Sequence, residues 1–387
     1  MHPSLGSFCF QLAVLATASH VSSTVGDKEC NCYLTNGTNS AYYSRRSFHD
    51  FRDLGEYARV PDPIWNTSKK VAVTSNYFKS DTWDSTWSIQ NWSNRGRSVS
   101  LSGDATILMI NSPNNVYIEE NDDDDMASDT FLTMRTMRLP GFQSAAEFES
   151  QLMYHYLSVR MLARVTGSPG ACMALFTYLG GEELADVQEA DIEIMTRDAN
   201  NRIQYTNQPS FTEDGDEVPK ATRNTTLPDG IKWDDWVVHR LDWTPERSVW
   251  YAQGQEVASI EFQTPKDPAQ LIINAWSDGG SWSGNMSVND AAYMQIQWID
   301  IVYNTTKENE DKRSLDGQIS ENEVGQNSVL TRREDGEDGC KVVCGIDDVD
   351  DAGKVKVLWR SAAAHTTEVT CWTKTLIVGS AIIMLYM

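Results

Sequence analysis

Three carboxylates alternate with two apolar residues in the middle of this chain, in the segment Glu189-Ala190-Asp191-Ile192-Glu193. Successive side chains of a β-strand point to opposite faces. The pattern therefore predicts a strand with its three acids on one face and Ala190 and Ile192 on the other. Like charges repel on such a face, and the repulsion is tolerated when the acids share protons or contact a ligand. The segment thus requires a sheet that is apolar on one side and acidic on the other.

The spacing of the two glutamates suits the cleavage of a glycosidic bond. Four strand steps place the Cα atoms of Glu189 and Glu193 about 13 Å apart. On a twisted sheet their side chains can lean together, toward the carboxyl separation of about 5–5.5 Å that is typical of retaining glycosidases. Asp191 would hydrogen-bond one of them and hold their pKa values apart. A solvated acidic strand face is the alternative interpretation.

Charge and composition exclude some classes of partner. The 387-residue chain carries a formal net charge of −23, so we expect no nucleic-acid partner, which would require a basic stripe. Neutral polysaccharide is compatible with this charge. The 13 Trp and 14 Tyr provide faces that stack on sugar rings, although a large β core also uses tryptophan. The cysteines lack the neighbours of a zinc site, and we expect no metal and no cofactor.

The N-terminal residues predict export from the cell. Residues 1–18 read as a signal peptide, because an apolar stretch from Phe8 ends in the small residues Ala16-Thr17-Ala18. Glycosylation sequons then follow at six positions, Asn36, Asn66, Asn91, Asn224, Asn285 and Asn304. We therefore expect a secreted, extracellular protein.

The C-terminal residues differ in composition from the rest. Residues 305–360 are rich in acidic and small polar residues and predict a disordered acidic stalk. In residues 361–387, small residues, a spacer and an apolar end from Leu376 match a glycolipid-anchor signal, which would attach the protein to the cell surface or wall. A short buried or frayed apolar end is the alternative.

Disulfide pairing cannot be read from the sequence. The seven cysteines are Cys9, Cys30, Cys32, Cys172, Cys340, Cys344 and Cys371. Cys9 would leave with the signal peptide and Cys371 with the anchor signal, so an odd cysteine would remain.

Residues 30–304 predict one all-β domain. Period-two alternation or short apolar runs occur in 159–165, 236–243, 249–251, 257–262, 271–276 and 294–298. Helical periodicity is scarce, and its nearest candidate, residues 145–152, is ambiguous. Many strands at short spacing predict a sandwich or jelly roll.

Several segments, in this order, resemble the family-16 glycoside hydrolases, the β-glucanase group with a concanavalin A-like jelly roll, in its secreted fungal type. They are residues 170–178, the acidic pentapeptide, 206–209, 236–245, 250–254, 273–284 and 294–303. The likeness covers about residues 30–304 and is loose in the first 100. Ala190 departs from the family pattern, which often has Ile or Leu there.

The resemblance implies a role for each acid. Glu189 would be the nucleophile and Glu193 the general acid/base, while Asp191 would orient and tune Glu189. The reaction would be a double displacement through a covalent glycosyl-enzyme, with retention at the anomeric carbon.

Some of the other candidate residues have two interpretations. His239 would line the site near the acid/base or be a structural hydrogen-bonding residue. Asn207 and Gln208 would bind sugar hydroxyls or hold a loop. Trp276 and Trp282 would form stacking platforms. We expect Trp243, Trp250 and Trp298 in the core, and Trp83, Trp87 and Trp92 either at outer sugar subsites or as packing.

The predicted function is endo-hydrolysis of β-1,3 or mixed β-1,3/1,4 glucan by a monomer. A cell-wall transglycosylase uses the same acids, with a sugar in place of water, and is the neighbouring alternative. The alternatives of another class are a lectin-like carbohydrate-binding protein without turnover and a purely structural surface protein.

Overall fold

Strands make up most of the regular secondary structure of the computed structural model, which describes residues 24–25, 27–67, 71–95, 101–123, 128–305, 340–347, 349 and 351–361. The one α-helix in these ranges is α1 (Asp81–Asp84). Short 3-10 helices connect strands: η1 (Asp27–Glu29), η2 (Gly55–Tyr57), η3 (Asn76–Lys79), η4 (Pro113–Asn115), η5 (Leu184–Asp186) and η6 (Pro228–Gly230). The predicted signal peptide and, beyond residue 361, the predicted anchor signal lie outside the described residues.

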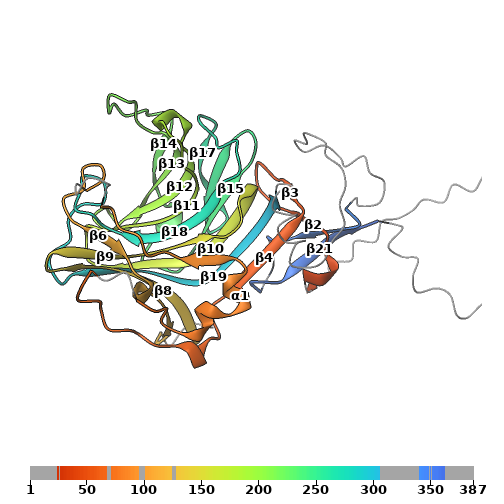
Figure 1. The fold of residues 1–387 in the computed structure, drawn as a ribbon. Coiled ribbons are helices and arrows are strands. Elements are labelled where there is room, and N and C mark those ends of the chain that lie inside the picture. Colours follow the sequence, from red (N-terminus) through yellow and green to blue (C-terminus); the bar gives the residue numbers. More distant parts are fainter. Residues whose placement is uncertain are drawn as a thin grey trace, which may run out of the picture.

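The first of two large sheets contains the acidic pentapeptide. Its main strands follow the order β14-β13-β12-β11-β18-β9, with β5 also paired to β9. Their bounds are β5 (Trp87–Ile89), β9 (Phe142–Ser150), β11 (Cys172–Leu179), β12 (Gln188–Met195), β13 (Arg202–Gln208), β14 (Thr222–Thr226) and β18 (Gln270–Trp276). Figure 1 shows this sheet curving upward toward β13 and β14.

The second sheet packs against the first. Its strands are β4 (Arg45–Asp50), β6 (Met109–Asn111), β7 (Val116–Glu120), β8 (Thr130–Leu139), β10 (Tyr154–Gly167), β15 (Val237–Trp243), β16 (Ser248–Ala252), β17 (Gln255–Ile260) and β19 (Ala291–Thr305). Strand β9 belongs to both sheets, because its first residues pair with β6 and β8 and its last with β18 and β5. The two sheets are therefore joined along one edge.

The apolar core lies between the sheets. Leu175 and Ile273 reach it from the first sheet, and Val159, Leu241 and Ile299 reach it from the second. Burying each such side chain contributes about 1.5–3 kcal/mol to folding. The result is the all-β jelly-roll sandwich predicted from the sequence.

Most predicted strands are present. The alternating segments correspond to β10, β15, β16, β17, β18 and β19. The ambiguous helical candidate at residues 145–152 is not a helix, because most of it forms the end of β9. Both faces of β9 are buried, so its sequence lacks the alternation of apolar and polar residues that marks a half-exposed strand.

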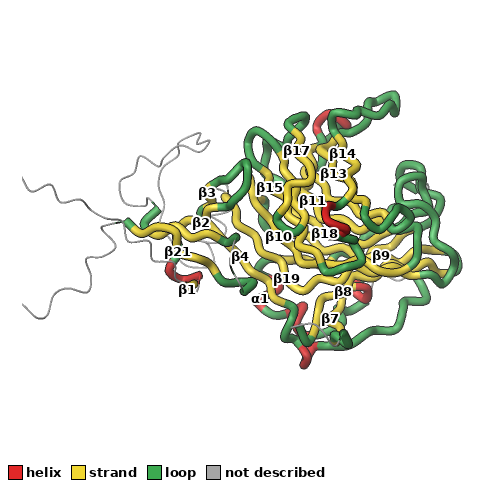
Figure 2. The backbone as a smooth tube through the Cα atoms, turned by 180° about the vertical axis from the view of Figure 1, so that it is seen from behind, coloured by secondary structure: helices red, strands yellow, loops and turns green. Residues whose placement is uncertain are grey.

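A third, smaller sheet corrects the prediction of a disordered stalk (residues 305–360) for residues 340–347, 349 and 351–360, the part of that sheet's segment that the structure describes. Strands β20 (Val342–Gly345) and β21 (Val355–Arg360) pair with each other and with β2 (Cys32–Leu34) and β1 (Thr24–Val25), while β3 (Tyr42–Tyr43) completes the order β1-β21-β20-β2-β3. Figures 1 and 2 show this sheet beside β4, at the end of the sandwich away from β12–β14. Residues 306–339 of the predicted stalk lie outside the described residues.

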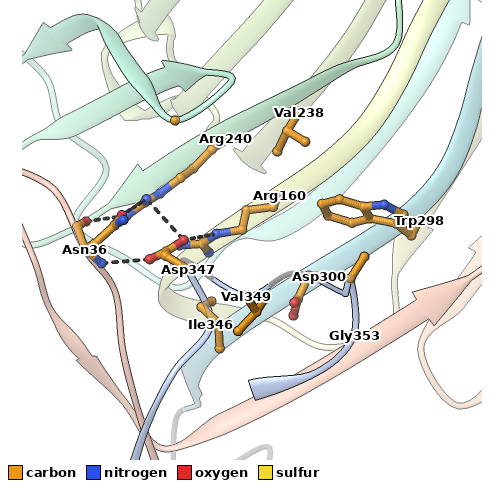
Figure 3. Close-up of a pocket in the computed structure, with 12 residues that line it drawn as sticks. Asn36, Arg160, Val238, Arg240, Trp298, Asp300, Ile346, Asp347, Val349 and Gly353 are labelled. Carbon is orange, nitrogen blue, oxygen red and sulfur yellow. Dashed lines mark hydrogen bonds and ion pairs between the residues drawn. The ribbon is translucent and has the colours of Figure 1, made fainter. Parts of the chain in front are cut away.

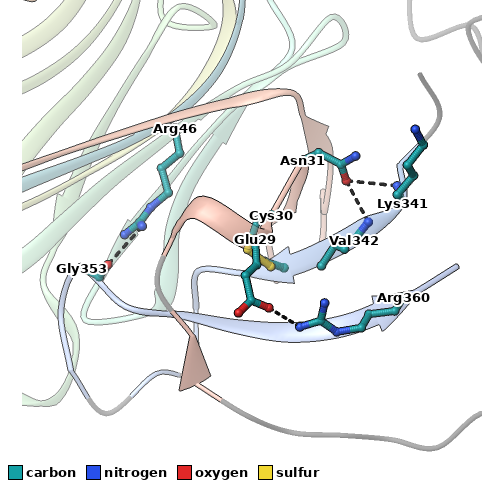
Figure 4. The surroundings of a disulfide bond; sticks show 9 residues. Glu29, Cys30, Asn31, Arg46, Lys341, Val342, Gly353 and Arg360 are labelled. Atoms are coloured by element: carbon teal, nitrogen blue, oxygen red, sulfur yellow. Dashed lines mark hydrogen bonds and ion pairs between the residues drawn. A yellow bond between two sulfur atoms is a disulfide. The ribbon is translucent and has the colours of Figure 1, made fainter. Parts of the chain in front are cut away.

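Two disulfides hold this small sheet together. Cys30 pairs with Cys344 and Cys32 with Cys340, across sequence separations of 314 and 308 residues. Asn31, between them, accepts hydrogen bonds at Oδ1 from the backbone N–H of Val342 at 2.8 Å and of Lys341 at 3.1 Å (Figure 4). The segment is thus ordered by covalent attachment to the N-terminal strands, together with a buried apolar cluster that includes Val342, Val355 and Val357.

Ion pairs attach the small sheet to the outer face of the second sheet. Asp347 contacts Arg160 at 2.7 Å and Arg240 at 3.4 Å, and the backbone N–H of Asn36 donates to the same carboxylate at 2.7 Å (Figure 3). A cavity of about 350 Å³ lies among these side chains. The arginines and Asp347 that line the cavity are paired with one another, so these ion pairs connect the small sheet to the second sheet.

We expect the disulfides to act as a redundant pair. Cys344→Ser or Cys340→Ser alone leaves the second bridge, which closes nearly the same loop, so each single variant should lose little stability. Removing both bridges should lower the free energy of unfolding by about 2–4 kcal/mol, because the unfolded chain gains the freedom of a very long loop. Denaturant unfolding of the three variants measures this. Additive losses in the two single variants would contradict redundancy.

Candidate active site

The three acids lie on the outer face of the first sheet, here called the acid face. Ala190 and Ile192 are buried in the core on the opposite side of β12. Alternation along the strand therefore directs Glu189, Asp191 and Glu193 away from the core. The strand pattern predicted from the sequence is confirmed.

Neighbouring strands determine what surrounds each acid. Across β11, Glu193 lies opposite Ala174, Asp191 opposite Phe176, and Glu189 opposite Tyr178. Across β13, the same three acids lie opposite Gln204, Thr206 and Gln208. Directly paired residues share a face, so a small side chain adjoins Glu193 and aromatic rings adjoin the other two acids.

Asp191 is the most buried of the acids, with 1% of its surface exposed. Burial raises its pKa well above the usual range, and the charges of Glu189 and Glu193 raise it further. Its side chain is hydrogen-bonded to Glu189, and its Oδ2 accepts from Gln208 Nε2 at 3.3 Å. Asp191 therefore retains a proton and donates it toward Glu189.

Glu189 receives that hydrogen bond. Burial raises its pKa to about 7, the hydrogen bond from Asp191 opposes this shift, and the charge of Glu193 adds to it. A donor aimed at a carboxylate favours its ionised form. The acidic pair therefore places the negative charge on Glu189 and the shared proton on Asp191, as a carboxylate nucleophile requires.

Glu193 has the properties of a general acid. It is 9% exposed, and burial raises its pKa, which favours the protonated form. Its Oε1 accepts from Trp282 Nε1 at 2.9 Å and from Cys172 Sγ at 3.6 Å. Its Oε2 has no hydrogen-bond partner among the described residues. One oxygen is thus held by the protein, and the other is buried without a partner among the described residues.

Gln208 and Asn207 are separated by the pleat of β13. Gln208 lies on the acid face beside Glu189 and Asp191. Asn207 lies opposite Ala190, is fully buried, and donates from Nδ2 to the backbone carbonyl of Phe262 at 3.0 Å. The prediction of a sugar-binding role is therefore wrong for Asn207, whose amide joins β13 to the segment after β17.

His239 is also placed away from the acids. It lies on β15 in the second sheet and shares its face with Leu241 and Trp243, both of which belong to the core. It is 2% exposed, and burial lowers its pKa to about 4. The prediction that His239 lines the site is corrected: it is a neutral side chain inside the sandwich.

The predicted tryptophans fall into two groups. Trp276 and Trp282 are half-buried beside Cys172, in contact with the apolar cluster next to Glu193. Trp92 is 42% exposed. The remaining ones are buried: Trp83, Trp87, Trp243, Trp250 and Trp298. Only the first group can present a ring to a ligand.

Sequence reasoning missed a second acidic position on this face. Glu147 on β9 lies opposite Asn274 on β18, which in turn lies opposite Ala174 in the row of Glu193. Glu147 accepts from Trp92 Nε1 at 2.5 Å, and burial raises its pKa to about 6. Its spacing of two from Glu149 repeats the period of the acidic pentapeptide and was the available signal. No sequence pattern around Cys172 indicated a functional role.

The described ranges also lack two other kinds of feature. They contain no cluster of three or more His, Cys, Asp or Glu side chains placed to hold a metal ion. Nor do they contain a helix with the length and apolar character needed to cross a membrane.

The sequence model of the family described as Glycosyl hydrolases family 16 matches residues 79–300, more than half of the chain. This chain belongs to glycosyl hydrolase family 16. The matched region includes every acid-face residue described above. Family 16 membership thus agrees with a strand that presents two glutamates and an aspartate on one face.

Characterised proteins show the same likeness. The beta-glucanase of Bacillus amyloliquefaciens is 24% identical over 155 residues, 38% of this chain and 58% of that protein. The xylanase/beta-glucanase of Ruminococcus flavefaciens is 24% identical over 133 residues, 34% of this chain and 16% of that protein. The matched part thus spans less than two thirds of these relatives.

Solved structures are similar to part of this chain. The beta-glucanase of Bacillus licheniformis is 19% identical with a TM-score of 0.44, covering 57% of this chain and 92% of that one. The laminarinase catalytic domain of Thermotoga maritima is 17% identical with a TM-score of 0.44 and the same coverage.

Proposed function

We propose that this chain is a retaining endo-β-glucanase that hydrolyses β-1,3 or mixed β-1,3/1,4 glucan. The observation that carries the proposal is the division of labour among the acids: a hydrogen bond from Asp191 to Glu189, and a buried Glu193 with one oxygen unpartnered. The names of the relatives, beta-glucanases and a laminarinase, support the substrate class.

The reaction proceeds in two displacements. Glu193 gives its proton to the glycosidic oxygen while the carboxylate of Glu189 attacks the anomeric carbon, so the leaving sugar departs as a neutral alcohol. Glu193, now ionised, takes a proton from water, and the resulting hydroxide displaces Glu189 from the glycosyl-enzyme. Both carboxyls return to their starting protonation, and the anomeric configuration is retained.

The acid face offers contacts suited to an uncharged polymer of sugars. Phe176 and Trp276 are half-buried, and Tyr178 is exposed, so their rings are available for stacking. Asn274 adds an amide and Glu147 a carboxyl for hydroxyl groups, in the row that extends from Glu193 across β11, β18 and β9. A glucan chain lying across the strands would follow this row.

Product analysis on a panel of defined β-1,3 and mixed-linkage β-glucans tests the proposal. We expect internal cleavage to short oligosaccharides and a β-anomer as the first product by NMR, with Glu189→Gln inactive. An α-anomer would exclude retention. With labelled acceptor oligosaccharides, longer labelled products would identify a transglycosylase instead. Binding without any cleavage by the wild type would identify a lectin-like protein.

We propose further that the protein is secreted as a monomer and held at the cell surface or wall by a glycolipid anchor. The predicted signal, the two disulfides and the exposure of the sequon asparagines, with Asn304 half-buried, support export to an oxidising compartment. Expression in a eukaryotic host tests this. Loss of mass on deglycosylation and release from membranes by a phospholipase are the expected results, and a cytosolic product would contradict the proposal.

Substitutions of Gln208 and Asn207, which are neighbours on β13, should affect turnover and stability differently. Gln208→Ala removes the donor to Asp191 from the acid face, so we expect turnover to fall roughly tenfold with little change in unfolding free energy. Asn207→Ala leaves the Phe262 carbonyl without its donor, so we expect about 1–3 kcal/mol of destabilisation and a near-normal kcat for the folded fraction. Steady-state kinetics and denaturant unfolding of both variants measure this. The reverse pattern would contradict the assigned register.

A further inference from the structure

We propose that Cys172 is a positioning residue that keeps the catalytic proton of Glu193 on Oε2, the oxygen that has no hydrogen-bond partner among the described residues. The inference rests on the proposed function and adds to it a residue that no likeness assigns. It begins from an unusual contact: a buried thiol against the side chain of a general acid.

The thiol belongs to a small hydrogen-bonded set on the acid face. Cys172 is fully buried on β11, one strand from Glu193, and its Sγ lies 3.6 Å from Glu193 Oε1. Trp276 hydrogen-bonds the same sulfur, and Trp282 Nε1 donates to the same Oε1 at 2.9 Å. Among the described cysteines Cys172 alone is outside a disulfide, so its S–H is retained as a donor.

The surroundings keep the sulfur protonated. Burial raises the pKa of Cys172 well above its usual range, and the charges of Glu193 and Asp191 raise it further. A neutral thiol next to a carboxyl group donates its hydrogen rather than accepting one. Its complete burial also excludes a role as a nucleophile that meets the substrate.

Two donors on one oxygen fix the position of the proton. With Trp282 and Cys172 both aimed at Oε1, that atom acts as the acceptor in either protonation state. The acid proton therefore resides on Oε2, which has no hydrogen-bond partner among the described residues. Without Cys172, Oε1 loses one of its two donors, and a rotated carboxyl could carry the proton on Oε1 instead.

Other groups facing Glu193 do not replace this function. On β12 it faces Asp191 and Glu189, both acids. The partners in the adjacent strands are neutral: Gln204 and Ala174 directly opposite, and Asn274 beyond. Glu147 is the next acid in that row. Arg197, two residues beyond the end of β12, donates to the Ser281 carbonyl at 2.7 Å.

The direction of the expected pKa change in Glu193 follows from the fact that Cys172 donates the hydrogen bond. A hydrogen bond to Oε1 stabilises ionised Glu193, so its removal raises the pKa of that acid. In Cys172→Ala the alkaline limb of kcat/KM for glucan should move upward by about half to one pH unit. We expect kcat to fall about three- to tenfold. Cys172→Ser restores a donor and should return the limb to the wild-type position or below it.

A spectroscopic measurement tests the contact without turnover. The S–H stretch of Cys172, isolated as the infrared difference between wild type and Cys172→Ala, should shift as pH rises and Glu193 ionises. The shift should be absent in Glu193→Gln. Circular dichroism of each variant verifies folding, and Cys172→Ser serves if the alanine variant does not fold.

The outcomes separate the two proposals. An S–H band that does not titrate, or identical alkaline limbs in wild type, Cys172→Ala and Cys172→Ser, would overturn the role of Cys172. A wild-type protein that cleaves no glucan would overturn the proposed function, while the infrared band would still decide whether Cys172 donates to Glu193.

Discussion

Glu189→Gln is expected to lower kcat on β-glucan by roughly 10⁴–10⁶-fold, the loss typical of removing a catalytic nucleophile. The amide has the size of the carboxyl group but cannot form the glycosyl ester. It also replaces the charged acceptor toward which Asp191 donates with a neutral amide, so the pKa of Asp191 should fall as one of the charges that raise it disappears. Initial rates of reducing-sugar release measure the loss.

A matched variant and a chemical rescue make this test specific. Glu182→Gln changes an exposed glutamate of the loop before β12 and should keep full activity. Glu189→Gly with added azide should yield an α-glycosyl azide, because the small anion attacks from the face that the nucleophile has left. Retained hydrolysis in Glu189→Gln would exclude this residue as the nucleophile and with it the double-displacement mechanism.

The second large effect is expected from Glu193→Ala. Without a general acid, cleavage of glucan should slow by about 10²–10⁴-fold. A dinitrophenyl glycoside has a leaving group that needs no proton, so its first step should be nearly unaffected and the glycosyl-enzyme should accumulate. A burst of released phenol followed by a slow phase is the expected time course.

Azide distinguishes the two glutamates by product. In Glu193→Ala it should attack the intermediate and give a β-glycosyl azide, the opposite anomer to that from Glu189→Gly. Equal losses on glucan and on the dinitrophenyl glycoside would show that Glu193 does not act as the acid. The same anomer from both variants would show that the roles have been assigned wrongly.

The acids could be read from the sequence because strand alternation is a local property. Glu189, Asp191 and Glu193 share a face whatever partners β12 has. The misplacement of Asn207 has a different origin, since a single step of register decides which of Asn207 and Gln208 faces the acids. That register is set by packing between β12 and β13, which motif spacing does not report.

His239 shows that resemblance to a family motif can suggest a wrong location when the local alternation of side chains indicates the right one. It alternates in step with Leu241 and Trp243, and this parity already favours the core face of β15. The resemblance to a family segment led instead to a site role. The apolar neighbours two positions away were the better guide.

The C-terminal strands could not be predicted, because what orders them is far away in the chain. The acidic, polar composition of residues 305–360 taken together predicts disorder, yet β20 and β21 pair with each other and with strands near residues 24–34. Two disulfides and a shared apolar cluster hold these strands together, and the disulfide connectivity is one of several that the cysteine count allows. The contact between Cys172 and Glu193 likewise depends on the pairing of β11 with β12, which the sequence does not report.

The bridges at residues 30–32 and 340–344 also have a mechanical consequence. A protease that cuts the chain anywhere between residues 305 and 340 severs the backbone but leaves the two pieces joined through sulfur. Whatever force or attachment acts on the residues after β21 is therefore transmitted to the sandwich through a covalent path that bypasses the intervening segment. A nicked molecule would keep its catalytic half tethered to its C-terminal end, and only a reductant would release it.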